Sequence, residues 1–177
     1  PRDTGVPAAR AAAKKGDVDR AIHWLDICLG TPFVTPADVR ADAAFAPILA
    51  DPRIVALLAE TEEQNAIIAT LEAGKTAEGI KALTASTAKR LQREGTLVSI
   101  GYRLLNRGHT DASLAVFELA TERHPKSANA WESYSEVLER SGRKAAAVNQ
   151  ARRALTLDPA PDVKKAAQER IARLVKG

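Results

Sequence analysis

The chain of 177 residues carries 26 Lys and Arg against 22 Asp and Glu, which gives a formal charge of +4. Its apolar fraction of 45% is enough for a continuous core, whereas only 4% of the residues are aromatic. One cysteine, Cys28, excludes a disulfide framework and a thiolate metal cluster. No stretch approaches the roughly 20 apolar residues that a membrane-spanning helix needs. Abundant alanine and the lack of β-branched runs predict helices.

The first third of the chain is predicted to contain a helix pair and an irregular insert. Residues 1–30 show two helical segments with a turn at Gly16 between them. Residues 31–59 are rich in proline and interrupt the regular pattern. The apolar side chains of this insert are expected to be exposed: Phe33, Val34, Phe45, Ile48 and Leu49. Exposed apolar side chains favour contact with another chain.

Two short helices are expected within the insert. Thr35 and Asp51 are each followed directly by proline. A threonine or aspartate at the N-cap with proline at the first helical position is a helix start signal. We therefore predict helices near residues 36–41 and 52–60, with an irregular stretch between them.

Three glycines divide the rest of the chain at a fixed spacing of 34 residues: Gly74, Gly108 and Gly142. A period of this length is typical of stacked two-helix units, none of which buries its apolar face alone. The predicted units are residues 60–93, 94–127 and 128–161. Thr61 followed by Gln64 predicts a capping box at the start of the first unit.

Large and small residues alternate at corresponding positions of the last two units. The second unit has Leu97, Ile100, Gly101, Leu104, Gly108, Ser113, Phe117, Ala120 and Pro125. The third has Trp131, Tyr134, Ser135, Leu138, Gly142, Ala147, Ala151, Ala154 and Pro159. These positions resemble the tetratricopeptide repeat (TPR) family. The resemblance implies an all-α, right-handed superhelical solenoid of helix-turn-helix repeats, and apolar residues at helical spacing in 162–177 predict a C-terminal capping helix.

The resemblance also bears on the origin of the chain. Residues 66–160 are similar to the TPR regions of some bacterial secreted and periplasmic proteins, including tails appended to secreted hydrolases. The chain begins with Pro1 instead of methionine, which indicates processing. We therefore expect a bacterial protein of the periplasm or the extracellular space and favour these compartments over the cytoplasm.

Two short motifs with chemical meaning are interpreted as chance matches. Residues 69–76 fit a relaxed phosphate-binding loop, but that loop must follow a strand, and here Gly74 is already explained as a repeat turn. Residues 86–89 fit the S-x-x-K pattern of serine β-lactamases, but its accompanying motifs are absent. Ser86 is expected to be a small packing residue.

Neither the histidines nor the basic residues form a site in the sequence. His23, His109 and His124 are dispersed, so we expect no metal site, no cofactor and no catalytic residues, and the chain is not predicted to be an enzyme. The late basic residues lack interleaved aromatics, so no nucleic-acid partner is expected: Arg140, Arg143, Lys144, Arg152, Arg153, Lys164 and Lys165.

The TPR resemblance implies that the first helices of the units line a concave groove. The candidate groove residues are Asn65, Ile68, Val98, Tyr102, Leu105, Asn106, Glu132 and Glu136, with Gln64, Ser99, Ser133 and Arg140 on the same face. This set is apolar in the middle unit and acidic in the next, which fits an apolar segment that carries Lys or Arg. Tyr102 and its neighbours are equally well explained by packing against other helices.

Three functions remain open from the sequence. The first is a non-catalytic TPR interaction module that binds a protein or peptide segment in the groove. The second is a self-assembling structural protein, a homo-oligomer or filament in which one copy contacts the next. The third is an accessory TPR domain of a secreted bacterial hydrolase.

Overall fold

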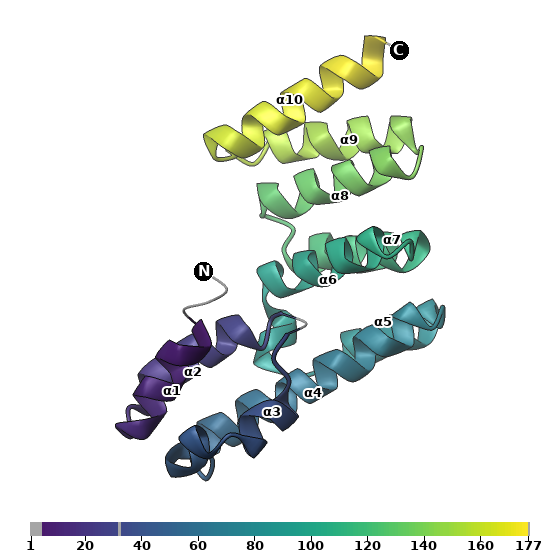
Figure 1. Cartoon of the computed structure of the whole chain (residues 1–177). Helices are drawn as coiled ribbons and strands as arrows, with labels where there is room; N and C mark the ends of the chain where they lie inside the picture. The colour runs from purple at the N-terminus through teal and green to yellow at the C-terminus, as the bar shows by residue number, and fades with distance from the viewer. Residues whose placement is uncertain (1–4, 32, 177) are drawn as a thin grey trace. The chain divides into compact units, whose positions relative to one another are not determined.

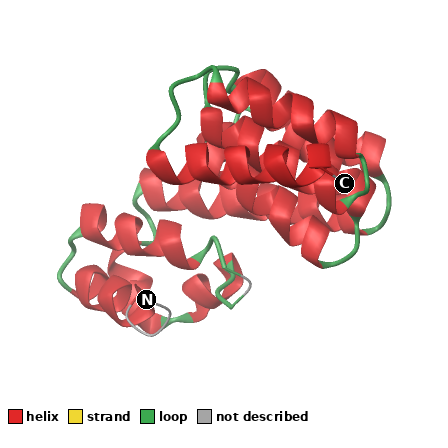
Figure 2. Ribbon diagram, turned by 90° about the horizontal axis from the view of Figure 1, so that it is seen from above, coloured by secondary structure: helices red, strands yellow, loops and turns green. Residues whose placement is uncertain are grey.

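The protein is described from a computed structural model that covers residues 5–31 and 33–176. Every regular element in these residues is a helix (Figure 2). The chain divides into two compact units, unit 1 with residues 1–66 and unit 2 with residues 67–177. Each unit is described by itself.

Unit 1 is built from short helices that pack through small side chains. Its elements are α1 (Gly5–Lys14), α2 (Val18–Cys28), α3 (Pro36–Ala41), the 3-10 helix η1 (Ala43–Ile48) and the first part of α4 (Pro52–Glu72). Ala9, Ala13 and Ala21 are fully buried and let α1 and α2 approach closely. The predicted helix pair is therefore present, although residues 1–4 lie outside the described part of the chain.

The two proline-linked helix starts are confirmed. Thr35 accepts a hydrogen bond from the Asp38 amide, and the Asp38 carboxylate accepts one from the Thr35 amide, which completes a capping box. Asp51 accepts a hydrogen bond from the Arg53 amide in the first turn of α4. Side-chain acceptors thus satisfy amides that have no partner inside the helix.

The capping box expected at Thr61 is wrong. The helix that begins at Pro52 continues without a break to Glu72, so Thr61 lies in its middle. The Thr61 hydroxyl is buried and donates to the Leu57 carbonyl, at 2.8 Å. With no glycine or proline to stop the helix, the threonine bonds to the carbonyl four residues back instead of forming a cap.

The expected exposure of the insert is also partly wrong. Phe45 and Ile48 are only 2% exposed, because η1 turns them into the core of unit 1 beside Val39 and Leu25. Phe33 remains 69% exposed. Val34 and Leu49 are half-buried against the same core. Of the five residues expected to be exposed, only Phe33 is, so exposed apolar side chains give little support to self-assembly.

Unit 2 is an all-α helical-repeat solenoid. It contains the end of α4, then α5 (Thr76–Ala85), η2 (Lys89–Gln92), α6 (Glu94–Asn106), α7 (Thr110–Arg123), α8 (Ala128–Arg140), α9 (Lys144–Leu155) and α10 (Pro161–Lys176). From α6 to α10 the helices are stacked in chain order (Figure 1). The helix α10 contacts α9 and α8 just as α8 contacts α7 and α6. It therefore takes the place of the first helix of a further repeat.

The repeat glycines end the first helix of each pair. Gly74, Gly108 and Gly142 have φ of +79°, +85° and +80°. In each case the amide after the glycine donates to a carbonyl in the last turn, as Arg143 does to Leu138. A residue with a Cβ is strained in this left-handed conformation, which explains why glycine recurs there.

One buried hydroxyl joins the two helices of each complete repeat. In one repeat the Ser113 hydroxyl on α7 donates to the Gly101 carbonyl on α6, at 2.8 Å. In the next repeat the Ser135 hydroxyl on α8 donates to the Ala147 carbonyl on α9, also at 2.8 Å. Gly101 corresponds to Ser135 and Ser113 to Ala147 in the 34-residue period. The two repeats thus make the same contact from opposite helices.

Gly101 and Phe117 approach each other closely, and this contact can be tested by substitution. A Cβ added at Gly101 would lie 2.4 Å from the Phe117 ring, whereas one at Gly95 meets nothing within 4 Å. We expect Gly101→Ala to destabilise unit 2 by about 1–3 kcal/mol, because Phe117 is fully buried and cannot move aside. Gly95→Ala should instead stabilise α6 by up to about 1 kcal/mol.

Hydrogen exchange of the α6 and α7 amides measures both effects locally. Protection should fall in the Gly101 variant and rise or stay unchanged in the Gly95 variant. Equal protection in the two variants would contradict the close contact.

Candidate functional site

The predicted groove residues follow rows that cross successive first helices of the repeats. One row, with a period of 34 residues, contains Ile68, Tyr102, Glu136 and Arg170. The Tyr102 hydroxyl on α6 donates to the Glu136 carboxylate on α8, at 2.9 Å. The same carboxylate lies 3.8 Å from the Arg170 guanidinium on α10. Side chains of three helices therefore form one connected polar row.

Arg170 is the most buried charge of this row. Its side chain is 8% exposed and contacts three glutamates of α8. It donates to Glu132 and, at 2.9 Å, to Glu139. Such a cation compensates carboxylates that would otherwise be buried without a partner.

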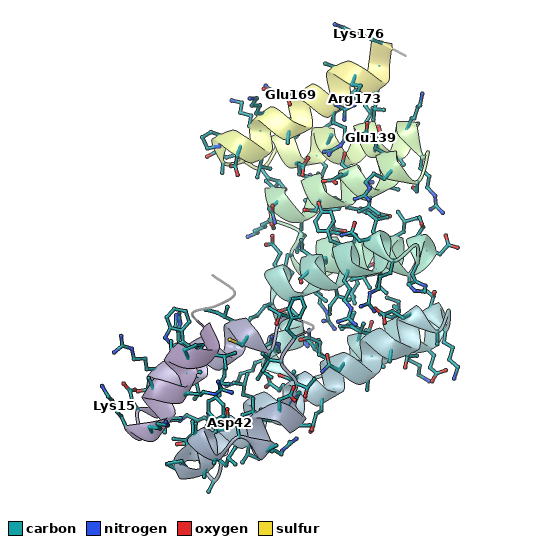
Figure 3. The ribbon with its side chains drawn as sticks, viewed as in Figure 1. Lys15, Asp42, Glu139, Glu169, Arg173 and Lys176 are labelled. Atoms are coloured by element: carbon teal, nitrogen blue, oxygen red, sulfur yellow. The ribbon has the colours of Figure 1, made fainter. Side chains whose placement is uncertain are left out.

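Arg173 adds a second bond between the same two helices. Its guanidinium donates to both oxygens of Glu139, at 2.9 and 2.8 Å. Figure 3 shows Glu139 on α8 and Arg173 on α10 facing one another. A two-pronged contact of this kind fixes the relative orientation of the helices better than a single bond does.

The same interval recurs two repeats earlier, between α4 and α6. Glu72 in the last turn of α4 accepts from Arg103, at 2.9 Å, and from Arg107, at 2.8 Å. Glu72 and Arg103 are 31 residues apart, as are Glu139 and Arg170. The sequence contains a signal for these pairs: a glutamate near the end of one helix is followed by an arginine 31 residues later.

The candidate groove residues differ widely in exposure. Ile68, Leu105 and Glu132 are buried, as are Gln64 and Ser133. Val98, Tyr102 and Glu136 are half-buried, and Asn65, Asn106, Ser99 and Arg140 are exposed. Asn65 belongs to unit 1, so only the residues from α6 and α8 are considered together. We call the exposed and half-buried ones among these the candidate face: Val98, Ser99, Tyr102, Asn106, Glu136 and Arg140.

The structure changes the expected charge of this face. Glu132 and Glu136 were expected to meet a Lys or Arg of a ligand. Arg170 of the same chain already contacts both of them. The expectation of a basic ligand at this face therefore loses its support.

Tyr102 packs against a neighbouring aromatic ring and also belongs to the candidate face. Its ring meets the Phe117 ring edge-on, with centroids 5.1 Å apart. Burial raises the pKa of Tyr102 to about 12, and the Glu136 carboxylate adds to this shift because it disfavours a second negative charge.

The two short motifs that were interpreted as chance matches have structural explanations. The segment 69–76 joins the end of α4 to α5 and does not follow a strand, as a phosphate-binding loop would. Ser86 is buried and accepts a hydrogen bond from the Ala88 amide.

In residues 5–31 and 33–176, no three His, Cys, Asp or Glu side chains are grouped to hold a metal ion. Within the same residues, no helix combines the length and hydropathy that crossing a membrane requires.

Comparison with known proteins finds one family to which part of unit 2 is similar. Residues 98–162 match the family model of the tetratricopeptide repeat. The match runs from α6 to the start of α10 and covers the two units whose residues resemble that family. A search of curated proteins found no match to the chain. The predicted TPR fold is confirmed for this part of the chain.

The buried cluster around Arg170 predicts a sharp difference between two neighbouring arginines. Arg170→Met leaves Glu132 buried without its cation and should destabilise unit 2 by about 3–5 kcal/mol. Arg173 is 59% exposed, so Arg173→Met should cost no more than about 1 kcal/mol. Urea denaturation measures the loss of stability in each variant, and hydrogen exchange of the α8 and α10 amides locates it.

A second substitution checks the cause of this loss. Adding Glu132→Gln to Arg170→Met should restore part of the stability, since the uncompensated charge is gone. If the double variant is no more stable than Arg170→Met, charge compensation is not the reason.

The shifted pKa of Tyr102 predicts how unit 2 responds to alkaline pH. The pKa is about 12 in the folded protein and about 10 in the unfolded chain. The contribution of protonated Tyr102 to stability is complete below pH 10 and is lost as the pH rises toward 12. In the Tyr134→Phe variant, Tyr102 is the only tyrosine of the sequence. The tyrosinate absorbance of this variant should therefore rise with a midpoint near pH 12. Circular dichroism recorded alongside verifies the fold, and a midpoint near pH 10 in folded protein would contradict the shift.

Proposed function

We propose that unit 2 is a non-catalytic TPR interaction module that binds a segment of a partner protein along the candidate face. The match of residues 98–162 to the TPR family carries this proposal, since stacked helix repeats offer an extended surface that suits protein segments. The partner lies across α6 and α8, because the candidate face comes from these two helices.

The polar groups of the face favour a segment that offers hydrogen-bond acceptors. Arg140 contacts Asn106 at 3.4 Å and Glu136 at 3.7 Å, both long. Contacts of this length are weak and are readily exchanged for groups of a ligand. The amide and guanidinium donate to main-chain carbonyls of the bound segment, while Val98 and Tyr102 contact an apolar side chain.

The charge balance of the face argues against strong selection for a basic ligand. Arg170 pairs with the buried Glu132 and the half-buried Glu136, and Arg140 remains exposed beside them. A neutral or weakly acidic segment therefore fits better than one rich in Lys. A segment that carries Lys or Arg, as expected from the sequence, is therefore not part of this proposal.

Site-specific photocrosslinking tests the proposal. A photoreactive amino acid at Ser99, which is exposed on α6, should capture a partner protein in cells that make this protein. The same group at Asn149, exposed on α9, is the matched control and should capture less.

A pair of variants then tests the face itself. Asn106→Ala with Arg140→Ala should reduce capture at Ser99 by about tenfold, because both donors are lost. Arg152→Ala, another exposed arginine, should leave capture unchanged. Equal capture at Ser99 and Asn149, or no effect of the paired substitution, would overturn the proposed surface.

A further inference from the structure

Unit 1 contains a pocket that the proposed function does not use. It has a volume of about 560 Å³ and lies between α1, α2, α3 and η1. Its apolar wall includes Val6, Leu25, Phe33, Val34, Val39 and Phe45. This volume is within the range of ligand and side-chain pockets in proteins. Every residue that lines it belongs to unit 1.

One wall of the pocket is an aromatic side chain in contact with solvent. Phe33 is 69% exposed, whereas Phe45, which also lines the pocket, is 2% exposed. A large apolar side chain left in water gains free energy when another molecule covers it, at about 25 cal/mol per Å². The pocket therefore offers a buried floor and an exposed edge to an apolar group.

Two carboxylates stand at the same pocket. Asp38 accepts from the Thr35 hydroxyl, at 2.7 Å, and this bond is the main cause that lowers its pKa. Asp42, labelled in Figure 3, accepts from the Ala44 amide, at 2.9 Å, and pairs with Arg10. The Ala44 amide and then Arg10 lower the pKa of Asp42. Both groups are ionised at neutral pH, and the pocket lining carries two negative charges against one positive charge.

The charge of the whole unit has the same sign. Residues 1–66 contain 7 Lys and Arg and 10 Asp and Glu, while residues 67–177 contain 19 and 12. Unit 1 is therefore acidic although the complete chain is basic. An acidic surface around an acidic pocket attracts cationic partners and repels anionic ones.

We propose that this pocket binds a segment of a partner protein in which a large apolar side chain is flanked by Lys or Arg. The apolar side chain packs against Phe33 and the apolar lining of the pocket, and the flanking cation lies beside Asp38, because Asp42 is already paired with Arg10. Anionic ligands are disfavoured by the net negative charge of the lining, which holds Asp38, Asp42 and Arg10. The site is separate from the candidate face of unit 2 and does not rest on its function.

Short labelled peptides test this pocket with the full chain. One peptide has a Leu-Phe pair flanked by lysines, a second has glutamates in place of the lysines, and a third has alanines in place of the Leu-Phe pair. Fluorescence anisotropy should show binding of the first peptide alone. Higher salt should weaken this binding, because the charges are exposed to solvent.

Substitutions locate the binding. Phe33→Ser should weaken it about tenfold. Asp38→Asn retains the acceptor oxygen of the helix cap and should weaken it about two- to fivefold. The matched controls are Val55→Ser and Asp19→Asn, which change exposed residues of unit 1 outside the pocket and should have no effect.

The outcomes separate this proposal from its alternatives. Equal binding of the lysine and glutamate peptides, or equal effects of Phe33→Ser and Val55→Ser, would overturn it. Sedimentation of the chain alone addresses the other occupant: if the protein forms larger species that Phe33→Ser disperses, the pocket holds a second copy and the proposed partner is wrong. Loss of capture at Ser99 in unit 2 would leave the peptide result unchanged.

Discussion

The buried guanidinium of Arg170 is the interaction on which the packing of α10 against α8 depends. It lies between α8 and α10 and contacts Glu132, Glu136 and Glu139. Charges removed from water must be compensated inside the protein. Because α10 supplies this compensation, the acidic side chains of α8 become part of the helix stack and are not left for a partner.

The solenoid is held by two kinds of contact that act in different directions. Within a repeat, small residues permit close approach, as Gly101 does under Phe117, and one buried hydroxyl bonds the pair. Between repeats, polar side chains on successive first helices bond across intervals of 31 to 38 residues. The first set defines each helix pair, and the second aligns one pair with the next.

The two surfaces proposed for binding differ in chemistry for a physical reason. On unit 2 the carboxylates are compensated internally, so hydrogen-bond donors such as Asn106 and Arg140 remain for a ligand. On unit 1 Asp38 is exposed at the pocket, whereas Asp42 is half-buried and paired with Arg10. The chain thus presents donors on one unit and negative charge with an apolar floor on the other.

The sequence alone determined the repeat turns and two helix starts, because glycine is needed for the left-handed turn at Gly108 and a residue that caps before proline starts a helix at Thr35 or Asp51. These signals are local and do not depend on the rest of the fold. Burial and charge pairing were decided only by the tertiary structure. Phe45 became a core residue, and Glu132 acquired Arg170 as a partner from 38 residues away, since such contacts depend on which helices are neighbours in space.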